Sequence, residues 1–486
     1  MLQQYVLIAA IWLVYWLYKR YYFSVHYLKK SKIPQPPAGD FFRGNGNLLN
    51  NLELKNTCDS LHKLFGDTFG ITSGTNVFVY TNDADLLYKI YKEQANTHVN
   101  RGDTLIPSDL MNDHSLLANE GQNWLRCRNI IGPELTTKKL HNEGIQEDLN
   151  DATECVLNYI QEQNTKSQAD TQSAIVDVGK LFKRFTLDTV LRTLYDKQGL
   201  VDYSSDTGDK NFMLKTLMRI IEKIYHPAFV WFQYIPILRP VVLWIDRVTT
   251  NFRGALIQLA ERALENRTVG ANGPRLKHKL LDAFDAGRLS RAELWGNAAF
   301  MVAAGWDTTA QSLAAFTWLM ATNPEKQAKL RDDIVRDGHK SKYLDWCIRE
   351  TLRLFPPALT ARCLAHDVEW KGMTLRKGMR LVPSIFNIHR KAEYWGNDAD
   401  TFRPERFAPE ESSAHHKAQF FAFGLGPRNC VGGKLAMLEM QLLIARLITK
   451  FSIQACEDTP KSLKVELPLI FVPVIRDRVL LKFVEL

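Results

Sequence analysis

Residues 421–433 read FAFGLGPRNCVGG and run directly into the apolar stretch KLAMLEMQLLIARLI. A single cysteine, Cys430, stands here among four glycines, a proline and an arginine. A buried, inert thiol is the commoner fate of a cysteine, but it leaves the four glycines unexplained. Glycines let the backbone approach a sulfur atom and its ligand closely, and a helix that begins just after Cys430 offers N–H groups that favour a thiolate. The stretch therefore favours a metal thiolate over a core thiol, without naming the metal.

The composition of the 486-residue chain indicates the class of protein, the state of its cysteines and the kind of partner. With 45% apolar and 24% charged residues and no low-complexity run, it is typical of a globular protein with a large core. Seven scattered cysteines without a CxxC pair argue against a disulfide framework and a structural zinc site, and favour a reducing compartment. The net charge is +9, but Lys and Arg are spread along the chain and no RRM, KH or zinc-finger pattern occurs. We therefore expect no nucleic acid partner, and favour a membrane surface or an acidic protein.

The segment from residue 2 to 18, LQQYVLIAAIWLVYWLY, is apolar except for two glutamines. As a helix it would span roughly 26 Å, close to the thickness of about 27 Å of the endoplasmic reticulum bilayer. Basic residues follow it, so the positive-inside rule places the rest of the chain in the cytosol. A cleaved signal peptide is the alternative, but it would need a basic start and a small-residue cleavage site. We expect a single-pass protein of the endoplasmic reticulum membrane, with a transmembrane anchor over 1–23, a basic and proline-rich hinge over 24–40, and a catalytic domain over 41–486 that faces the cytosol.

Helical patterns dominate this domain, and short β-like pieces lie towards its two ends. The helical patterns lie around Trp124 and over residues 148–161, 179–194 and 290–322. The β-like pieces cover residues 70–80, 368–384 and the tail 478–486. We therefore predict a mainly α fold with small β-sheets (α+β) in a single large domain.

Residues 225–244, YHPAFVWFQYIPILRPVVLW, are aromatic and interrupted by three prolines, so they cannot form one long helix. They form either a buried corner between two helices or an apolar flap over a pocket that dips into the membrane. The residues alone favour the corner.

The pattern over 290–322 begins with a capping box, in which Ser290 and Glu293 mark a helix start. The helix is apolar on most faces and is expected to be buried, but AGWDTT stands in its middle. One interpretation is a break, with Gly305 ending one helix and Asp307 capping the next. The other is functional, because a buried acid beside the hydroxyl of Thr308 can deliver protons to a bound oxygen species. Threonine hydroxyls can also bond a carbonyl one turn earlier and open the helix locally.

The stretch RETLRLFPP places Glu350 and Arg353 on one helical face. A solvated pair of this kind is common and contributes about 0.2–0.5 kcal/mol. Further on, FRPERF carries Arg406 between aromatic residues, and a second arginine would let a buried Glu350 be neutralised twice. The sequence leaves open whether the three side chains meet.

Together these stretches resemble the cytochrome P-450 superfamily. FAFGLGPRNCVGG is similar to its haem-binding loop FxxGxRxCxG, AGWDTT to its oxygen-activation motif, RETLR to its ExxR motif and FRPERF to its PERF segment. WLRCR, at 124–128, is similar to the WxxxR helix whose Trp and Arg contact a haem propionate. All five occur in the family's order and spacing, and with the anchor and the proline hinge they give the layout of the microsomal class.

The resemblance implies a role for each matching residue. Cys430 would be the axial ligand of the iron of haem b, and Arg428, two residues earlier, is placed to reach an anionic group such as a propionate. The full implied set is Thr308 and Asp307 for proton delivery; Trp124, Arg128, Arg362 and Arg428 on the propionates; Phe423 and Gly424 beside the haem; and Glu350, Arg353 and Arg406 as a structural triad.

The implied reaction inserts one atom of O2 into an unactivated bond. The chain has no dinucleotide or flavin fingerprint, so the electrons of NADPH require a separate NADPH–cytochrome reductase, with cytochrome b5 as a second candidate donor. By the family's layout, apolar segments line the substrate pocket: residues 105–117, 225–244, Phe300, Ala304, 358–360 and 469–474. The chain looks like fungal enzymes of secondary metabolism, which favours a bulky terpenoid or steroid-like intermediate. A fatty acid or alkane hydroxylase, a reductase-independent isomerase or dehydratase on the same fold, and a membrane-tethered haem protein for sensing or electron transfer are the alternatives.

Overall fold

The computed structural model describes residues 10–15, 17–18, 28–37, 45, 54–73, 76–102, 110, 113–167, 174–204, 211–224, 244, 251–267, 269, 274–469 and 472–486. Helices occupy most of this part of the chain, and four small sheets accompany them, so the predicted mainly α fold is confirmed. The helices are α2 (Leu28–Lys30), α3 (Leu54–Phe65), α4 (Ala84–Tyr88), η3 (Lys89–Glu93), α6 (Gly121–Ile131), η4 (Gly132–Leu135), α7 (Thr137–Leu140), α8 (Glu143–Ser167), α9 (Val178–Tyr195), α10 (Phe212–Ile224), α13 (Phe252–Leu264), α14 (Leu276–Asp285), α15 (Arg291–Thr322), α16 (Pro324–Asp337), η8 (Gly338–Lys340), α17 (Lys342–Leu354), α18 (Ile385–Ile388), α19 (Ala392–Trp395), η9 (Pro404–Phe407), α20 (Pro409–Ser412) and α21 (Gly433–Lys450). The strands are β1 (Thr68–Ser73), β2 (Asn76–Thr81), β3 (Ile175–Asp177), β4 (Arg362–Cys363), β5 (Val368–Trp370), β6 (Met373–Leu375), β7 (Arg380–Pro383), β8 (Phe451–Ala455), β9 (Val465–Leu469), β10 (Val472–Ile475) and β11 (Leu480–Glu485).

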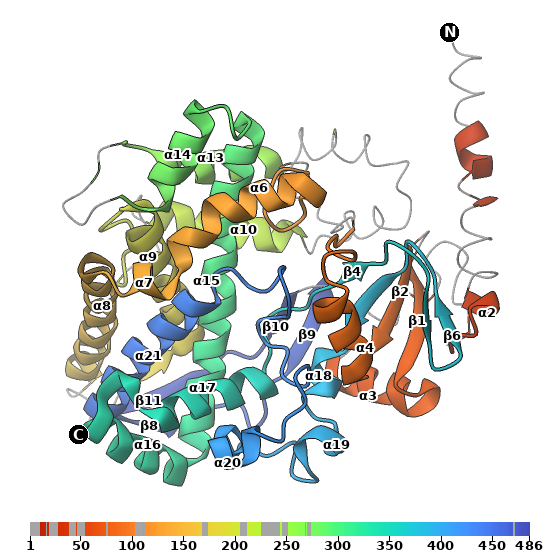
Figure 1. Ribbon diagram of the computed structural model, residues 1–486. Helices are drawn as coiled ribbons and strands as arrows, with labels where there is room; N and C mark the ends of the chain where they lie inside the picture. The colour runs from red at the N-terminus through yellow and green to blue at the C-terminus, as the bar shows by residue number, and fades with distance from the viewer. Residues whose placement is uncertain are drawn as a thin grey trace.

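The largest sheet has the strand order β1-β2-β7-β4 and lies beside the helical part of the molecule (Figure 1). β1 and β2 form an antiparallel hairpin, whereas β2 pairs in parallel with β7, from Phe78 opposite Arg380 to Thr81 opposite Pro383. The C-terminal strand β11 lies between β3 and β8 in a second sheet. All three stretches predicted to be β-like therefore contain strands.

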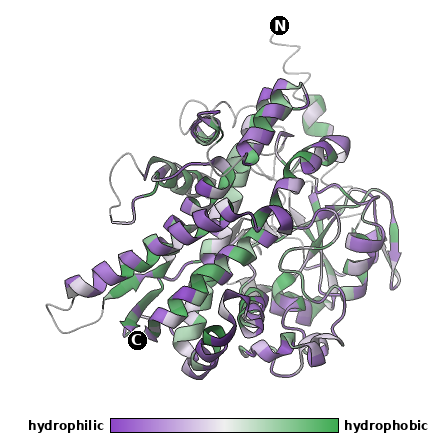
Figure 2. Ribbon diagram, turned by 60° about the vertical axis from the view of Figure 1, so that its left-hand side comes forward, coloured by the Kyte–Doolittle hydropathy of each residue, from purple (hydrophilic) through white to green (hydrophobic). Residues whose placement is uncertain are grey.

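Helix α15 runs through the middle of the helical part and packs against α9, α13 and α17 (Figure 1). The predicted capping box forms at its start: Glu293 N–H donates to Ser290 Oγ at 3.2 Å, and Ser290 N–H donates to a Glu293 carboxylate oxygen at 2.9 Å. Two large hydrophobic clusters enclose the helix. In Figure 2 green residues concentrate towards the middle of the molecule, and purple residues line the outward sides of the outer helices.

Of the two interpretations of AGWDTT, the break is wrong, because α15 is continuous from Arg291 to Thr322. Gly305 instead allows a close helix crossing: a Cβ added there would lie 2.7 Å from Val190 Cγ2 of α9. The Thr308 hydroxyl donates to the carbonyl of Ala304 at 2.8 Å, as the sequence suggested, without interrupting the helix. Packing from both sides therefore holds a continuous helix through a sequence that could have ended one.

Residues 10–15 and 17–18 of the predicted anchor are helical, and apolar side chains such as Ile11 and Val14 are exposed there. Within the described ranges, no helix combines the length and the apolar character that crossing a bilayer requires. The remainder of residues 2–18 and all of 225–244 except Trp244 lie outside the described residues.

Candidate functional site

The loop that carries Cys430 is closed by its own backbone. The N–H of Cys430 donates to the carbonyl of Phe423 at 2.8 Å, and Gly424 and Gly426 both have a φ of +70°. A Cβ added at Gly426 would lie 2.0 Å from the carbonyl oxygen of Tyr91 in η3. Both the backbone conformation and the close contact require glycine at 426, so this glycine serves the packing of the loop against η3.

The sulfur of Cys430 faces the start of α21. The backbone N–H groups of Gly432 and Gly433 bond the sulfur and lower the pKa of the thiol, as do the charges of Arg101 and Arg128, but burial is the larger effect and raises that pKa above its ordinary value. The side chain nevertheless keeps accessible surface. Cys430 is thus positioned for a cation to bind it as a thiolate.

Four arginines surround this loop: Arg101, Arg128, Arg362 and Arg428. Burial is the main cause that lowers the pKa of each of them, to about 9 for Arg101 and to about 8 for Arg428. Mutual repulsion lowers the pKa further for Arg101 and Arg428, whereas Glu120 raises that of Arg428. The cluster has an excess of positive charge, and an anionic group placed between the guanidinium groups would stabilise it.

Arg428 binds the main chain of distant segments. Its guanidinium donates to the carbonyls of Val99 at 3.0 Å and of Leu116 and Leu117 at 3.3 Å, and also to that of Asn119. The ring of Trp124 lies 4.5 Å from the guanidinium carbon. Arg428 therefore clamps residues 99 and 116–119 onto the cysteine loop, in addition to contributing positive charge.

Arg101 was missed by the sequence analysis, because no motif contains it. It donates to the carbonyl of Leu117 at 3.1 Å and to that of Arg428 at 3.2 Å. Arg128 donates to the carbonyl and to the side-chain oxygen of Asn429, next to Cys430. Arg362 lies over the ring of Tyr91, with 4.4 Å between the guanidinium carbon and the ring centroid.

Helix α15 has one partly exposed face. The helix is buried over most of its length, but Phe300, Ala303, Ala304 and Thr308 keep partial exposure. Their spacing of three and four residues places them on one face. Helix α15 packs against α21, which begins just after Cys430. The face is small and apolar except for the threonine hydroxyl.

Asp307 and Thr308 bond different partners. The Asp307 carboxylate is buried, lies 3.4 Å from Lys183 Nζ of α9 and accepts from Gln311 Nε2 at 2.6 Å. Lys183 is partly exposed, so the carboxylate connects to solvent through this lysine. Thr308 is on the partly exposed face described above. Asp307 therefore connects to the protein surface through Lys183, whereas Thr308 lies on the apolar face of α15.

The structure brings Glu350, Arg353 and Arg406 together. Arg353 binds the Glu350 carboxylate with two donors at 2.6 and 2.7 Å, and Arg406 Nε donates to the same carboxylate at 3.3 Å. The three side chains are at most 1% exposed. A solvated surface pair is therefore the wrong interpretation, and this is a buried, hydrogen-bonded ion cluster.

His389 is a second residue that sequence reasoning left out of the site. The backbone N–H of Phe421 donates to its Nε2 at 2.8 Å, so Nδ1 carries the proton and donates to the carbonyl of Arg353 at 3.0 Å. Burial lowers the pKa of His389 to about 3, so the ring is neutral. This imidazole joins the ion cluster to the first residue of the cysteine loop.

These residues fit a haem group. The single sulfur donor, bonded by N–H groups at a helix start, suits a thiolate ligand of haem iron. The excess positive charge of the arginine cluster suits the anionic propionates, and the partly exposed apolar face of α15 suits an apolar ligand. Cys430 would hold the iron, and Trp124, Arg101, Arg128, Arg362 and Arg428 would hold the propionate side.

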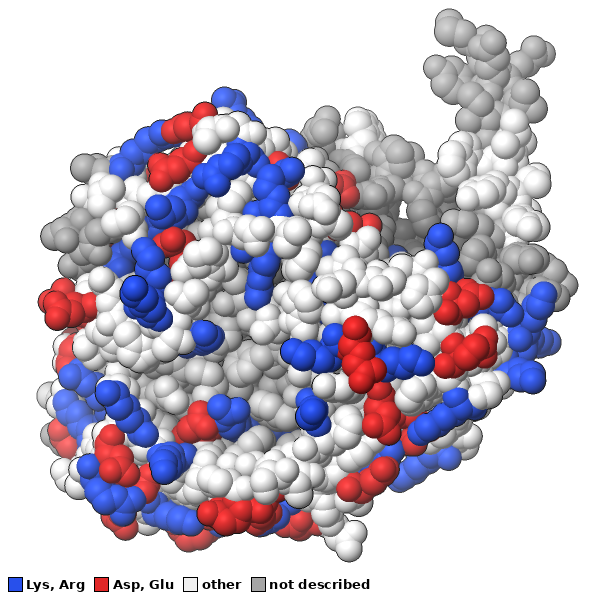
Figure 3. All heavy atoms as spheres, in the orientation of Figure 1, with Lys and Arg blue, Asp and Glu red and all other residues white. Residues whose placement is uncertain are grey.

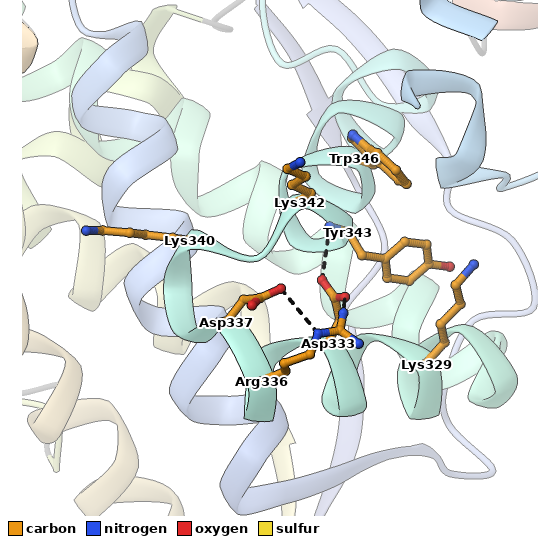
Figure 4. Close-up of a pocket in the computed structure, with 8 residues that line it drawn as sticks. All are labelled: Lys329, Asp333, Arg336, Asp337, Lys340, Lys342, Tyr343 and Trp346. Atoms are coloured by element: carbon orange, nitrogen blue, oxygen red, sulfur yellow. Dashed lines mark hydrogen bonds and ion pairs between the residues drawn. The ribbon is translucent and has the colours of Figure 1, made fainter. Parts of the chain in front are cut away.

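A separate surface hollow of about 590 Å³ lies between α16 and α17 (Figure 4). Four of its charged side chains form ion pairs: Arg336 with Asp333 and Asp337, and Lys329 with Glu405 outside the hollow. It includes none of the residues described above, so it is not part of the candidate site.

The chain is similar to proteins of one family along most of its length. The family model for Cytochrome P-450 matches residues 34–481. A cytochrome P-450 numbered in the 3A series from Mesocricetus auratus is 26% identical, with 93% of each chain covered. Cytochrome P-450 3A9 of Rattus norvegicus is 26% identical over 86% of each chain, and cytochrome P-450 CYP13A10 of Caenorhabditis elegans is 26% identical over 83% of this chain and 85% of its own.

Proposed function

The chain belongs to the cytochrome P-450 family and is a monooxygenase, and on this premise we propose that it oxidises a bulky, largely apolar molecule of terpenoid or steroid-like type. We propose further that it receives the electrons of NADPH from a separate reductase, and that residues 1–23 anchor it in the endoplasmic reticulum membrane with the catalytic domain in the cytosol. The observation that carries the proposal is the accessible thiol of Cys430 just before α21, which bonds the N–H groups of Gly432 and Gly433 and lies near the charges of Arg101 and Arg128.

Cys430 would hold the haem iron, and the bound group would supply the activation of O2. The protein residues then have three tasks. The N–H groups of Gly432 and Gly433 stabilise the thiolate, and the arginine cluster binds the anionic edge of the cofactor. Asp307 takes protons from solvent through Lys183, and Thr308 holds a proton at its Oγ1 on the substrate side of α15.

The residues exposed on α15 support an apolar substrate. Phe300, Ala303 and Ala304 offer carbon surface on one face of this helix. Thr308 is the polar group on this helix face. A charged substrate would leave its charge unpaired against these residues, whereas a bulky hydrocarbon skeleton would bury apolar area.

The charge of the surface supports an acidic electron donor. Blue side chains gather over α6 and α7 on the face shown in Figure 3. The basic residues of these helices include Arg126, Lys138 and Lys139, and α21, which packs against α7, adds Lys434 and Arg446. Arg126, Lys139 and Arg446 also pair with acidic residues of the chain, whereas Lys138 and Lys434 are exposed. A reductase or a cytochrome b5 with an acidic docking face would meet this surface close to the cysteine loop.

The test is reconstitution of the purified, haem-loaded protein with an NADPH–cytochrome reductase and a panel of three probes: testosterone, farnesol and lauric acid. The proposal expects NADPH-dependent products from the steroid or the terpenoid probe that carry oxygen from labelled O2. Product from lauric acid alone would support the fatty acid alternative. Turnover without NADPH or reductase would point to an isomerase or dehydratase and overturn the proposal.

A Thr308→Ala substitution tests the proton path. We expect haem binding to be retained, while product formed per NADPH falls about tenfold or more and hydrogen peroxide rises, because general acid–base groups contribute roughly 10²–10⁴-fold. The measurement compares NADPH consumed, peroxide formed and product formed. Ser312→Ala is the matched control, since Ser312 also donates to a carbonyl one turn earlier, at 2.9 Å, but is buried. Equal coupling in both variants would refute the role of Thr308.

A further inference from the structure

The apolar face of helix α15 is open over one part and covered just before it. Phe300, Ala304 and Thr308 keep partial exposure, whereas Asn297, three residues before Phe300 on the same face, is fully buried. At a rise of 1.5 Å per residue, the open part from Phe300 to Thr308 is about 12 Å long. Another segment of the chain therefore ends the open face between Asn297 and Phe300.

This segment is the main chain of residues 113–119, which we call the crossing segment. The N–H of Leu116 donates to Asn297 Oδ1 at 2.8 Å. Asn297 Nδ2 donates to the carbonyl of Glu293, one turn earlier in α15, at 2.8 Å and to that of His114 at 3.4 Å. Because an amide oxygen only accepts and an amide nitrogen only donates, these partners fix the orientation of the Asn297 side chain.

A glycine beside Asn297 lets the crossing segment approach the helix closely. A Cβ added at Gly296 would lie 2.6 Å from the carbonyl oxygen of His114 and 2.7 Å from that of Leu110. Both contacts are to main-chain atoms, so an added side chain would have to displace the backbone. Gly296 thus makes room for the crossing segment, and Asn297 bonds it.

The crossing segment is also held by the cysteine loop. Arg428 donates to the carbonyl of Leu116 at 3.3 Å, so this one residue is bonded through its N–H to α15 and through its carbonyl to the loop. Within the segment, the carbonyl of Ser115 accepts from the N–H of Asn119 at 2.9 Å and closes a turn. The position of the segment over α15 therefore depends on few bonds, and the bond to Asn297 is the one that α15 supplies to Leu116.

We propose that Asn297 is a positioning residue that determines ligand specificity: by bonding the crossing segment to α15, it sets the length of apolar helix face that a ligand can reach. This rests on the proposed function in one respect, namely that the ligand lies along the open face of α15. An apolar ligand gains affinity with the area that it buries, so the end of the face limits the length of skeleton that still gains affinity. Asn297 is buried and acts through the segment that it holds.

The first test concerns the bond and needs no ligand. Hydrogen exchange of the haem-loaded protein, read by mass spectrometry with fragmentation to single residues, compares Asn297→Ala with the natural protein. We expect the N–H of Leu116 to exchange up to roughly tenfold faster in the variant, because it loses its acceptor. Thr317→Val is the matched control, since Thr317 is buried on the same helix and donates to carbonyls of that helix. Unchanged exchange at Leu116 in Asn297→Ala would refute the bond.

The second test measures the reach of the face with 1-alkylimidazoles of increasing chain length, whose free ring nitrogen binds haem iron and shifts its absorption spectrum. In the natural protein the dissociation constant should fall about fourfold per methylene group until the chain meets the crossing segment, and then level off or rise. In Asn297→Ala this limit should move to longer chains, by up to about four methylene groups, because one uncovered helical turn adds roughly 5 Å and each extended bond spans about 1.2 Å. Imidazole itself should bind both proteins equally.

Gly296→Ala is an independent variant for the same measurement. It keeps Asn297 but displaces the crossing segment through contact of the added Cβ with the carbonyl of His114. We expect it to move the chain-length limit in the same direction, whereas Thr317→Val should keep the limit of the natural protein. A limit that stays unchanged in Asn297→Ala while imidazole still binds would overturn the specificity role, because a purely structural residue changes stability without changing the limit. If Asn297→Ala does not retain haem, Gly296→Ala decides by the same criterion.

The outcomes also separate this proposal from the proposed function. Failure of imidazole to shift the spectrum of the natural protein would overturn the proposed function, and the specificity role with it. A limit that moves in both Asn297→Ala and Gly296→Ala would support the specificity role even if neither testosterone nor farnesol were turned over, in which case the proposed substrate class alone would fail.

Discussion

A Cys430→Ala protein loses the absorption band that a carbon monoxide complex of thiolate-bound haem iron shows, and monooxygenase activity disappears. The physical reason is the donor set of the site, since Cys430 provides the sulfur that the N–H groups of Gly432 and Gly433 bond. Alanine leaves these N–H groups and the nearby arginines without the atom that they stabilise. The measurement is the reduced, carbon monoxide-treated spectrum of the purified protein, together with its haem content.

Cys456→Ala is the control, because Cys456 is also a free, partly accessible thiol but lies at the end of β8, outside the site. We expect it to keep the band and the haem content of the natural protein. A thiolate band that persists in Cys430→Ala would refute the assignment of the ligand.

Glu350→Gln has the second large effect. The substitution leaves Arg353 and Arg406 buried with their common carboxylate removed, and breaking a buried ion pair in this way costs about 3–5 kcal/mol. Because His389 connects Arg353 to Phe421, we also expect loss of haem from the cysteine loop. The measurement is the denaturant midpoint and the haem content.

Glu411→Gln provides a matched comparison, since it removes the carboxylate of an exposed pair with Arg403, which is 2.6 Å away. Exposed pairs contribute about 0–1 kcal/mol, so this variant should retain haem and nearly all of the stability. If Glu350→Gln were as stable as Glu411→Gln, the buried cluster would not support the fold.

The parts of the fold that depend on residues close together in the sequence could be predicted from the sequence. The pattern around Trp124 became α6, and the capping box at Ser290 marked the start of α15, because caps and periodicity act within one or two helical turns. The continuity of α15 at Gly305 could not be predicted in this way, because it depends on Val190 of another helix. The break was a reasonable local interpretation that tertiary packing overrode.

The residues of the candidate site fall into two groups: those that belong to a sequence motif and those that only the fold brings together. Its motif residues could be identified because their order and spacing are visible in one chain. Arg101 and His389 belong to no motif, and their contacts reach Arg428 and Phe421. Contacts across such separations leave no periodic signal. The partner of Asp307, Lys183, was missed for the same reason.

The parallel pairing of β2 with β7 also has a consequence for how the chain folds during synthesis. Strand β2 ends at Thr81 and its partner begins at Arg380, so about 300 residues separate the two. At roughly 5–20 residues per second, the ribosome needs about 15–60 s before β7 is available. During this time the β2 edge of the hairpin lacks its partner strand, and open strand edges pair with other chains. We therefore expect nascent chains that stall before residue 380 to aggregate or to depend on chaperones, whereas chains that have passed β7 close the edge within the same molecule.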